Sequence, residues 1–139
     1  MLIREVYGSE LNKGFLHCLE ALYKNVATGE KACTIYRKRC FNIKTYGVVE
    51  DDEIIGTIAL VVFSTYGHNG ALTARIEDVA VREDQQRKGL GRLLVHHAIE
   101  QARAQGAYKV ELSCKKHLLD FYSKCGFVET ESTMRIDLN

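Results

Sequence analysis

The stretch Gln86-Arg-Lys-Gly-Leu-Gly91 decides how this sequence folds. The alternating apolar residues at 75–82 precede it and predict a strand, and residues 90–104 after it carry the apolar spacing of a helix. Glycine allows a tight turn and a close approach of the backbone to a ligand, and the first N–H groups of a helix attract anions. The sequence therefore predicts a strand–loop–helix unit that can receive a phosphate group.

The spacing of this loop differs from two well-known phosphate-binding motifs. It lacks the Gly-Lys-Ser/Thr of a Walker A loop, and it does not match the dinucleotide pattern G-x-G-x-x-G. A Gly-x-Gly turn by itself also fits a plain connection between a strand and a helix. The basic side chains of Arg87, Lys88 and Arg92 favour anion binding, because each can pair with a phosphate oxygen.

Apolar spacing and turn residues predict the elements on either side of this unit. They are a strand at 2–6, a helix at 11–26, a basic helical stretch within 30–44, a hairpin at 46–64, a loop at 65–73, a strand at 109–114, a short helix at 118–125 and one or two closing strands within 127–138. The break in alternation at Glu77-Asp78 predicts a β-bulge. The order indicates an α/β fold with a mixed, mostly antiparallel sheet, flanking helices and a late βαβ unit, and the length fits a single domain over 1–139.

The composition narrows the class of protein. Hydrophobic residues make up 46% and charged residues 27%, which is typical of a globular chain. Nineteen basic and 18 acidic residues leave a net charge of +1, which argues against a nucleic-acid partner bound by bulk positive charge. We see no membrane-spanning run and no signal peptide, and five cysteines without a C-x-x-C pair argue against disulfides and metal sites. These features predict a cytoplasmic protein with reduced thiols.

Two motifs together resemble the GNAT-type N-acetyltransferase superfamily. A strand ending in Glu77-Asp-Val-Ala-Val81, followed by Gln86-x-x-Gly89-x-Gly91, is similar to its acetyl-CoA pyrophosphate loop, and Phe121-Tyr-Ser-Lys-Cys-Gly-Phe127 is similar to its helix-to-strand corner. Within the superfamily, Ile76-Glu-Asp-Val79, Tyr108-Lys109 and the segment Phe121 to Phe127 most resemble the glucosamine-6-phosphate N-acetyltransferases. The resemblance implies the GNAT fold and transfer of acetyl from acetyl-CoA to a small primary amine, with glucosamine 6-phosphate as the first candidate.

The resemblance also implies how acetyl-CoA, the co-substrate, is held. The backbone of Val79, Ala80 and Val81 would pair with the pantetheine arm like an added strand. Lys124 would reach the adenosine phosphate. The pyrophosphate would lie on the loop and the helix start, which consist of Gln86, Arg87, Lys88, Gly89, Leu90, Gly91 and Arg92.

The implied catalytic residues are Tyr122 and Glu77. Tyr122 would contact the thioester and protonate the departing thiolate, a role that suits a phenol because it stays protonated at neutral pH. Glu77 would help the amine to lose a proton, directly or through water, and Asp78 would bind sugar hydroxyls or the amine. The plainer interpretations are a packed aromatic ring and surface charge on a strand. Strand alternation turns only one of two adjacent residues inward, unless a bulge intervenes.

Two departures from the superfamily pattern leave the acceptor open. Ser113 stands where an acid is usual, and Leu118 where an asparagine is usual. Neither departure falls in the loop 86–91 or at Tyr122, so the sequence supports acetyl transfer better than it supports glucosamine 6-phosphate as the acceptor. The alternatives are another acceptor (an aminoalkylphosphonate, a polyamine or a protein amine) or a CoA-binding domain without catalysis.

Three further features of the sequence bear on the site and on the assembly of the protein. The basic stretch 31–44 is either a solvated helix face or a clamp for a phosphorylated acceptor or for the CoA phosphates. Cys114 and Cys125 flank the expected site, and we interpret them as structural thiols rather than nucleophiles. The resemblance implies a homodimer, with residues 132–138 at or across its interface.

Overall fold

A computed structural model describes residues 1–39 and 42–139, and it is built on one five-stranded sheet. The strands lie side by side in chain order: β1 (Leu2–Glu5), β2 (Ile43–Glu50), β3 (Glu53–Ser64), β4 (Leu72–Val81) and β5 (Ala107–Glu111). The first four pair antiparallel, and β5 pairs parallel to β4. The prediction of a mixed α/β sheet is confirmed.

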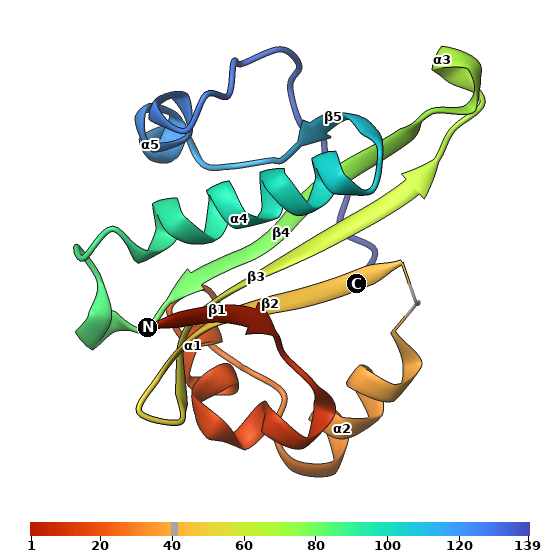
Figure 1. The fold of residues 1–139 in the computed structure, drawn as a ribbon. Coiled ribbons are helices and arrows are strands. Elements are labelled where there is room, and N and C mark those ends of the chain that lie inside the picture. The colour runs from red at the N-terminus through yellow and green to blue at the C-terminus, as the bar shows by residue number, and fades with distance from the viewer. Residues whose placement is uncertain (40–41) are drawn as a thin grey trace.

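Helices cover both faces of this sheet (Figure 1). The turns η1 (Gly8–Glu10) and η2 (Leu11–Phe15) lead into α1 (Leu16–Leu19), and α1 and α2 (Gly29–Lys38) lie on one face. The other face carries α4 (Leu90–Ala104) and α5 (Leu119–Lys124), with the turns η3 (Glu83–Gln85) and η4 (Lys116–Leu118) before them. The short helix α3 (Gly67–Gly70) forms the tip of the β3–β4 hairpin.

The main core lies between the sheet and α4. Ile58 and Leu60 of β3 pack in one cluster with Leu94 and Val95 of α4, and all four are almost completely buried. The helix runs over residues 90–104 as predicted, but its apolar Leu93 is 44% exposed. The reason is the helical period, because a buried stripe that includes Val95 turns position 93 toward solvent.

The opposite face has a smaller core, and the helix predicted at 11–26 is interrupted there. Gly14 has a φ of 94°, and a Cβ atom on it would lie 2.2 Å from the carbonyl oxygen of Ile54. This close approach interrupts the helix within η2, where Lys13 and Gly14 have non-helical backbone angles, and α1 begins at Leu16. Helical structure ends at Leu19, because Leu22 has no core to pack against and is 46% exposed.

The bulge predicted at Glu77-Asp78 is present. Ala59 of β3 pairs with Glu77 and Thr57 pairs with Ala80, so two residues of β4 stand opposite one residue of β3. Asp78 takes up the extra length with a φ of 51°.

The closing strands predicted within 127–138 are wrong. The structure describes this segment and assigns no strand to it. Its alternating apolar side chains Met134, Ile136 and Leu138 are each more than 80% exposed, because they meet no partner strand within the chain. The strand predicted at 109–114 lies earlier in the chain, since β5 runs from Ala107 to Glu111.

Candidate active site

The sheet opens between β4 and β5. The two strands pair only from Leu72 opposite Ala107 to Arg75 opposite Glu111, and β5 accordingly lies along one end of β4 (Figure 1). Beyond that point, residues 77–81 pair with β3 on one side and, within the described chain, with no strand on the other. An unpaired strand edge offers N–H and C=O groups to another extended molecule. Val79, Ala80 and Val81 lie at this edge.

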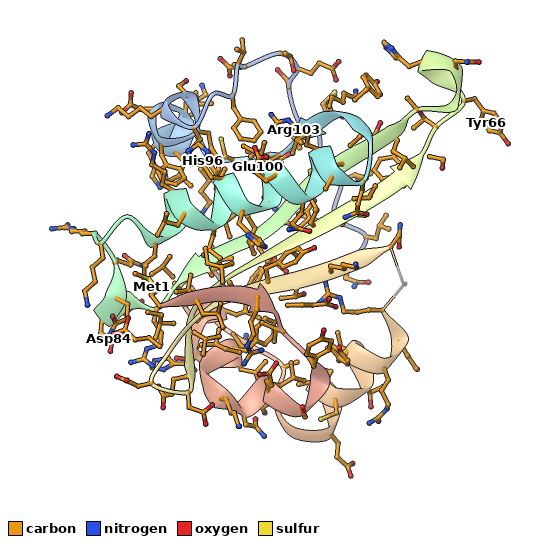
Figure 2. The ribbon with its side chains drawn as sticks, in the orientation of Figure 1. Met1, Tyr66, Asp84, His96, Glu100 and Arg103 are labelled. Carbon is orange, nitrogen blue, oxygen red and sulfur yellow. The ribbon has the colours of Figure 1, made fainter. Side chains whose placement is uncertain are left out.

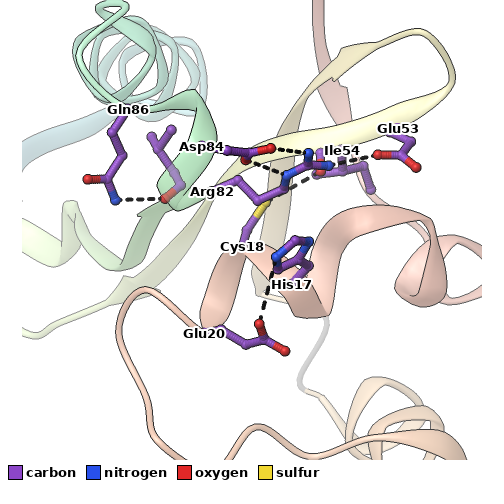
Figure 3. Close-up of polar contacts among 9 residues, drawn as sticks. His17, Cys18, Glu20, Glu53, Ile54, Arg82, Asp84 and Gln86 are labelled. Carbon is purple, nitrogen blue, oxygen red and sulfur yellow. Dashed lines mark hydrogen bonds and ion pairs between the residues drawn. The ribbon is translucent and has the colours of Figure 1, made fainter.

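Arg82 anchors the loop that leaves this edge (Figure 3). Its Nη1 atom lies 2.7 Å from Oε2 of Glu53, and its Nη2 atom lies 2.7 Å from Oδ2 of Asp84. The guanidinium donates hydrogen bonds to the Asp84 carboxylate and lowers its pKa to about 2. Gln86 adds a hydrogen bond of 3.0 Å from its Nε2 to the carbonyl oxygen of Val81. The side chain of Gln86 therefore shapes the loop, which is a second role beside the one predicted for it.

The loop ends at the first turn of α4. Gly89 caps the helix with a φ of 79°, a left-handed conformation that glycine adopts without strain, and no side chain caps the helix there. The N–H groups of Leu90, Gly91 and Arg92 have no partner within the helix, and they carry the positive end of its dipole. A Cβ on Gly91 would lie 3.3 Å from the Phe121 ring, so this glycine brings α5 close to α4. Such a helix start can bind an anion.

Tyr122 lies in α5 beside this opening. Its side chain packs in the same cluster as Val79 and Val81, between the rings of Phe121 and Phe127. Burial is the main cause that raises the pKa of Tyr122 to about 12. The residue is thus a packed aromatic ring and also a phenol that keeps its proton at neutral pH.

The bulge places Glu77 and Asp78 on the same face of the sheet. Ile76 and Val79, on either side of the pair, pack toward α4, while Ala80 packs in the core of the opposite face. Because side chains alternate along a strand, the two residues between Ile76 and Val79 can share one face only where an extra residue is inserted. Both side chains are exposed on the face that carries α1 and α2.

A contact of Tyr23 is independent evidence that Asp78 lies on this face. Tyr23 follows α1, and its hydroxyl donates a short hydrogen bond to Oδ1 of Asp78, which is the main reason that its pKa is raised to about 12. Glu77 makes a looser ion pair with Arg75, whose Nε lies 3.5 Å from Oε1. Asp78 is therefore fixed in position, whereas Glu77 is exposed and only loosely held.

Residues 10–127 match the model of a family described as "Acetyltransferase (GNAT) family". The chain belongs to this family. As a GNAT chain it is 34% identical over 136 residues to "Probable glucosamine 6-phosphate N-acetyltransferase" of Drosophila melanogaster, with 92% of this chain covered and 61% of the fly protein. It is 30% identical to "Glucosamine 6-phosphate N-acetyltransferase 1" of Oryza sativa subsp. japonica, over 95% of this chain and 84% of the rice protein.

Solved structures agree with this assignment. The glucosamine-6-phosphate N-acetyltransferase of Arabidopsis thaliana superimposes with a TM-score of 0.87 at 25% identity, covering 99% of this chain and 98% of that one. An acetyltransferase of Trypanosoma brucei gives 0.89 at 30% identity, with 99% of both chains covered. The GNAT fold and the resemblance to an N-acetyltransferase are confirmed.

Lys124, Cys125 and His96 of this GNAT domain lie in ordinary structural surroundings. Lys124 is exposed at the end of α5 and lies 3.0 Å from Asp120. Burial raises the pKa of Cys125, so this thiol stays protonated. His96 points away from the sheet along α4, on the side that also carries Glu100 and Arg103 (Figure 2). Within residues 1–39 and 42–139, no group of three metal-ligating side chains is found, and no helix is long and apolar enough to cross a membrane.

The sequence did not point to Tyr23 or single out Arg39. Tyr23 stands 55 positions from Asp78, and its local pattern is that of an amphipathic helix. Arg39 was one of several basic residues in the stretch 31–44, of which Lys31, Arg37 and Lys38 are exposed and Arg39 is turned inward. The local sequence carries no signal for the contact of Tyr23 with Asp78, because this contact depends on the chain folding back onto the sheet.

Proposed function

We propose that this chain transfers the acetyl group of acetyl-CoA to the amine of a small acceptor, with glucosamine 6-phosphate as the first candidate. Residues 1–139 would act as one domain. The observation that carries the proposal is the open edge of β4, which lies beside both an uncapped helix start and a protonated phenol in a GNAT fold. The names of the relatives support the sugar phosphate as acceptor.

The open edge and the loop fit acetyl-CoA. The backbone groups of Val79, Ala80 and Val81 would pair with the amides of the pantetheine arm. The N–H groups at the start of α4, with the loop residues Gln86, Arg87, Lys88, Gly89, Leu90, Gly91 and Arg92, would hold the pyrophosphate. Lys124 would have to leave Asp120 to reach the adenosine phosphate.

The chemistry would be direct attack with both substrates bound, which places the reacting atoms in line. Glu77 would accept a proton from the ammonium, directly or through water, and release it to solvent. A strand N–H near Val79 or Ala80 would polarise the carbonyl oxygen. As the C–N bond forms and the C–S bond breaks, Tyr122 would give its proton to the sulfur and be reprotonated by the attacking amine.

We also propose a homodimer. The exposed side chains Met134, Ile136 and Leu138 alternate as in a strand, and a second copy of the chain could cover them. Light scattering of the full chain and of a chain cut after residue 131 tests this, because only the full chain should be dimeric. The proposed setting is the cytoplasm, in amino-sugar metabolism.

The decisive experiment is a thiol-release assay with acetyl-CoA. Glucosamine 6-phosphate is compared with glucosamine, an aminoalkylphosphonate, a polyamine and a protein amine. Release with the sugar phosphate alone supports the proposal in full. Release with another amine keeps acetyl transfer and rejects the sugar, and CoA binding without any release shows a domain that has lost catalysis.

A further inference from the structure

Arg39, on the face that carries α1 and α2, differs from its basic neighbours Arg37 and Lys38 because it is partly buried rather than exposed. Arg39 follows α2 and is partly buried, and this burial lowers the pKa of its guanidinium. Its Nη1 donates a hydrogen bond of 2.5 Å to Oγ1 of Thr45. Among the residues that the structure describes, it forms no ion pair.

The surroundings of Arg39 are suited to an anion. A guanidinium carries five N–H donors in a planar fork that matches phosphate and carboxylate oxygens, and only one of these donors is used on Thr45. Arg39 lines a cavity of about 250 Å³ together with Tyr36, Lys44 and the single acid Glu5. A partly desolvated cation is stabilised by an anionic partner, and the residues that the structure describes supply none at bonding distance.

Glu77 and Asp78, the acid pair, lie on the same face as Arg39, and the spacing of the strands sets the distance between them. Thr45 of β2 pairs with Ala59 of β3, which pairs with Glu77 of β4. Two strand spacings separate Thr45 from Glu77, which is about 10 Å. The Asp78 carboxylate acts on the pKa of Arg39 across this gap, and the small, buried Ala59 side chain lies between. A positive group and a negative pair thus lie on one face of the sheet, at the two ends of this strip.

Building on the proposed acetyl transfer, we propose that Arg39 binds a phosphate group of the acceptor and sets the preference for a phosphorylated amine. The acid pair would meet the ammonium at the other end of the strip. An amino-sugar phosphate carries its amine and its phosphate on opposite sides of one ring, so a single molecule can reach both ends.

The test compares Arg39→Gln with the control Arg37→Gln, which removes an exposed charge from the neighbouring end of α2. We expect Arg39→Gln to raise the KM for glucosamine 6-phosphate by about 10- to 100-fold, because the charge-assisted hydrogen bonds from the guanidinium to the phosphate are lost. The KM for acetyl-CoA and the rate with glucosamine should not change, and Arg39→Lys should recover part of the loss. An unchanged KM in a variant with wild-type thermal stability overturns the inference, as does equal use of both sugars by the wild type.

Binding of glucose 6-phosphate, which has no amine to react, separates this inference from the proposed function. Calorimetry in the presence of CoA should detect it with the wild type and with Arg37→Gln, and about 10-fold or more weaker binding with Arg39→Gln. Equal affinity, or no binding to the wild type, overturns the role of Arg39. A wild type that binds the sugar phosphate but acetylates no amine would contradict the proposed function and leave Arg39 supported.

Discussion

The helices on the two faces of the sheet differ in regularity. On one face α4 is an unbroken helix of 15 residues with five buried side chains. It begins where the loop beside the open edge of β4 stops. On the other face α1 has four residues after an irregular turn, and α2 buries only Ala32. Under the proposed function, a rigid face would present the cofactor loop and a loosely packed face would supply the groups that select an acceptor.

The largest effect should come from the rigid face, through Tyr122. Replacing Tyr122 by Phe keeps the packed ring and removes the proton donor, so we expect turnover to fall by about 100- to 1000-fold with acetyl-CoA binding nearly intact. Steady-state kinetics with direct titration of CoA measures both quantities. Tyr66→Phe is the control, because Tyr66 lies fully exposed near the tip of the hairpin (Figure 2). Wild-type turnover in the Tyr122 variant would reject the leaving-group role.

On the face that carries α1 and α2, the largest loss of stability should come from a change at Gly14. Adding a Cβ there brings it against the Ile54 carbonyl and forces a side chain into a left-handed conformation, so Gly14→Ala should lower the free energy of unfolding by about 3 kcal/mol. Urea titration followed by circular dichroism measures it. Gly29→Ala, with a φ of 56° and open space around it, should cost only about 1 kcal/mol. Equal losses would show that strain alone, rather than the approach to Ile54, explains the glycine.

Gly89 tests whether the loop binds the cofactor. Gly89→Val introduces backbone strain in open space, and we expect about 10- to 30-fold weaker binding of acetyl-CoA, because the N–H groups at the helix start lose their alignment. Gly106→Val at the other end of α4 has a similar φ of 86° and is also open, so it should match the loss of stability without the loss of affinity. Unchanged affinity in a folded Gly89 variant would reject the loop assignment.

The smallest effect should come from His97, on the inner side of α4. Its ring packs edge-on against Tyr46 with centroids 4.8 Å apart, and burial lowers its pKa below the usual value of 6.5. The unfolded chain then binds the proton more readily, so stability should decline as pH falls through 6.5 toward the lower pKa of the folded state. Denaturant titrations at pH 7.5 and 5.5 should show a smaller decline for His97→Gln than for the exposed control His96→Gln. Equal declines would assign the pH dependence to other groups.

The features that the sequence predicted are those with a local cause. The loop 86–91, the helix over 90–104 and the bulge at Glu77-Asp78 follow from glycine, from a 3.6-residue period and from a break in alternation. Each of these signals lies within a few residues of the structure that it produces.

The features that the sequence missed depend on distant partners. The strands expected within 127–138 had the right pattern, but a strand forms only where another strand is available to pair with it. The helix at 11–26 stopped because Leu22 found no core, and the contact of Tyr23 with Asp78 joins residues that are 55 positions apart. The sequence predicted the bulge at Glu77-Asp78, but it did not identify Tyr23, whose hydroxyl contacts Asp78.

The single surplus residue in β4 has a consequence for how this site can change. Before the bulge, even-numbered positions such as Ile76 point toward α4, and after it odd-numbered positions such as Val79 do. Deleting one residue at 77–79 would remove the bulge, so side chains would alternate regularly along the whole strand. Either the two acids or the apolar residues Val79 and Val81 would then point to the opposite face of the sheet. Under the proposed function, substitutions could adjust the acceptor while the length of this segment stays constant, so insertions and deletions here should be far less tolerated than changes of side chain.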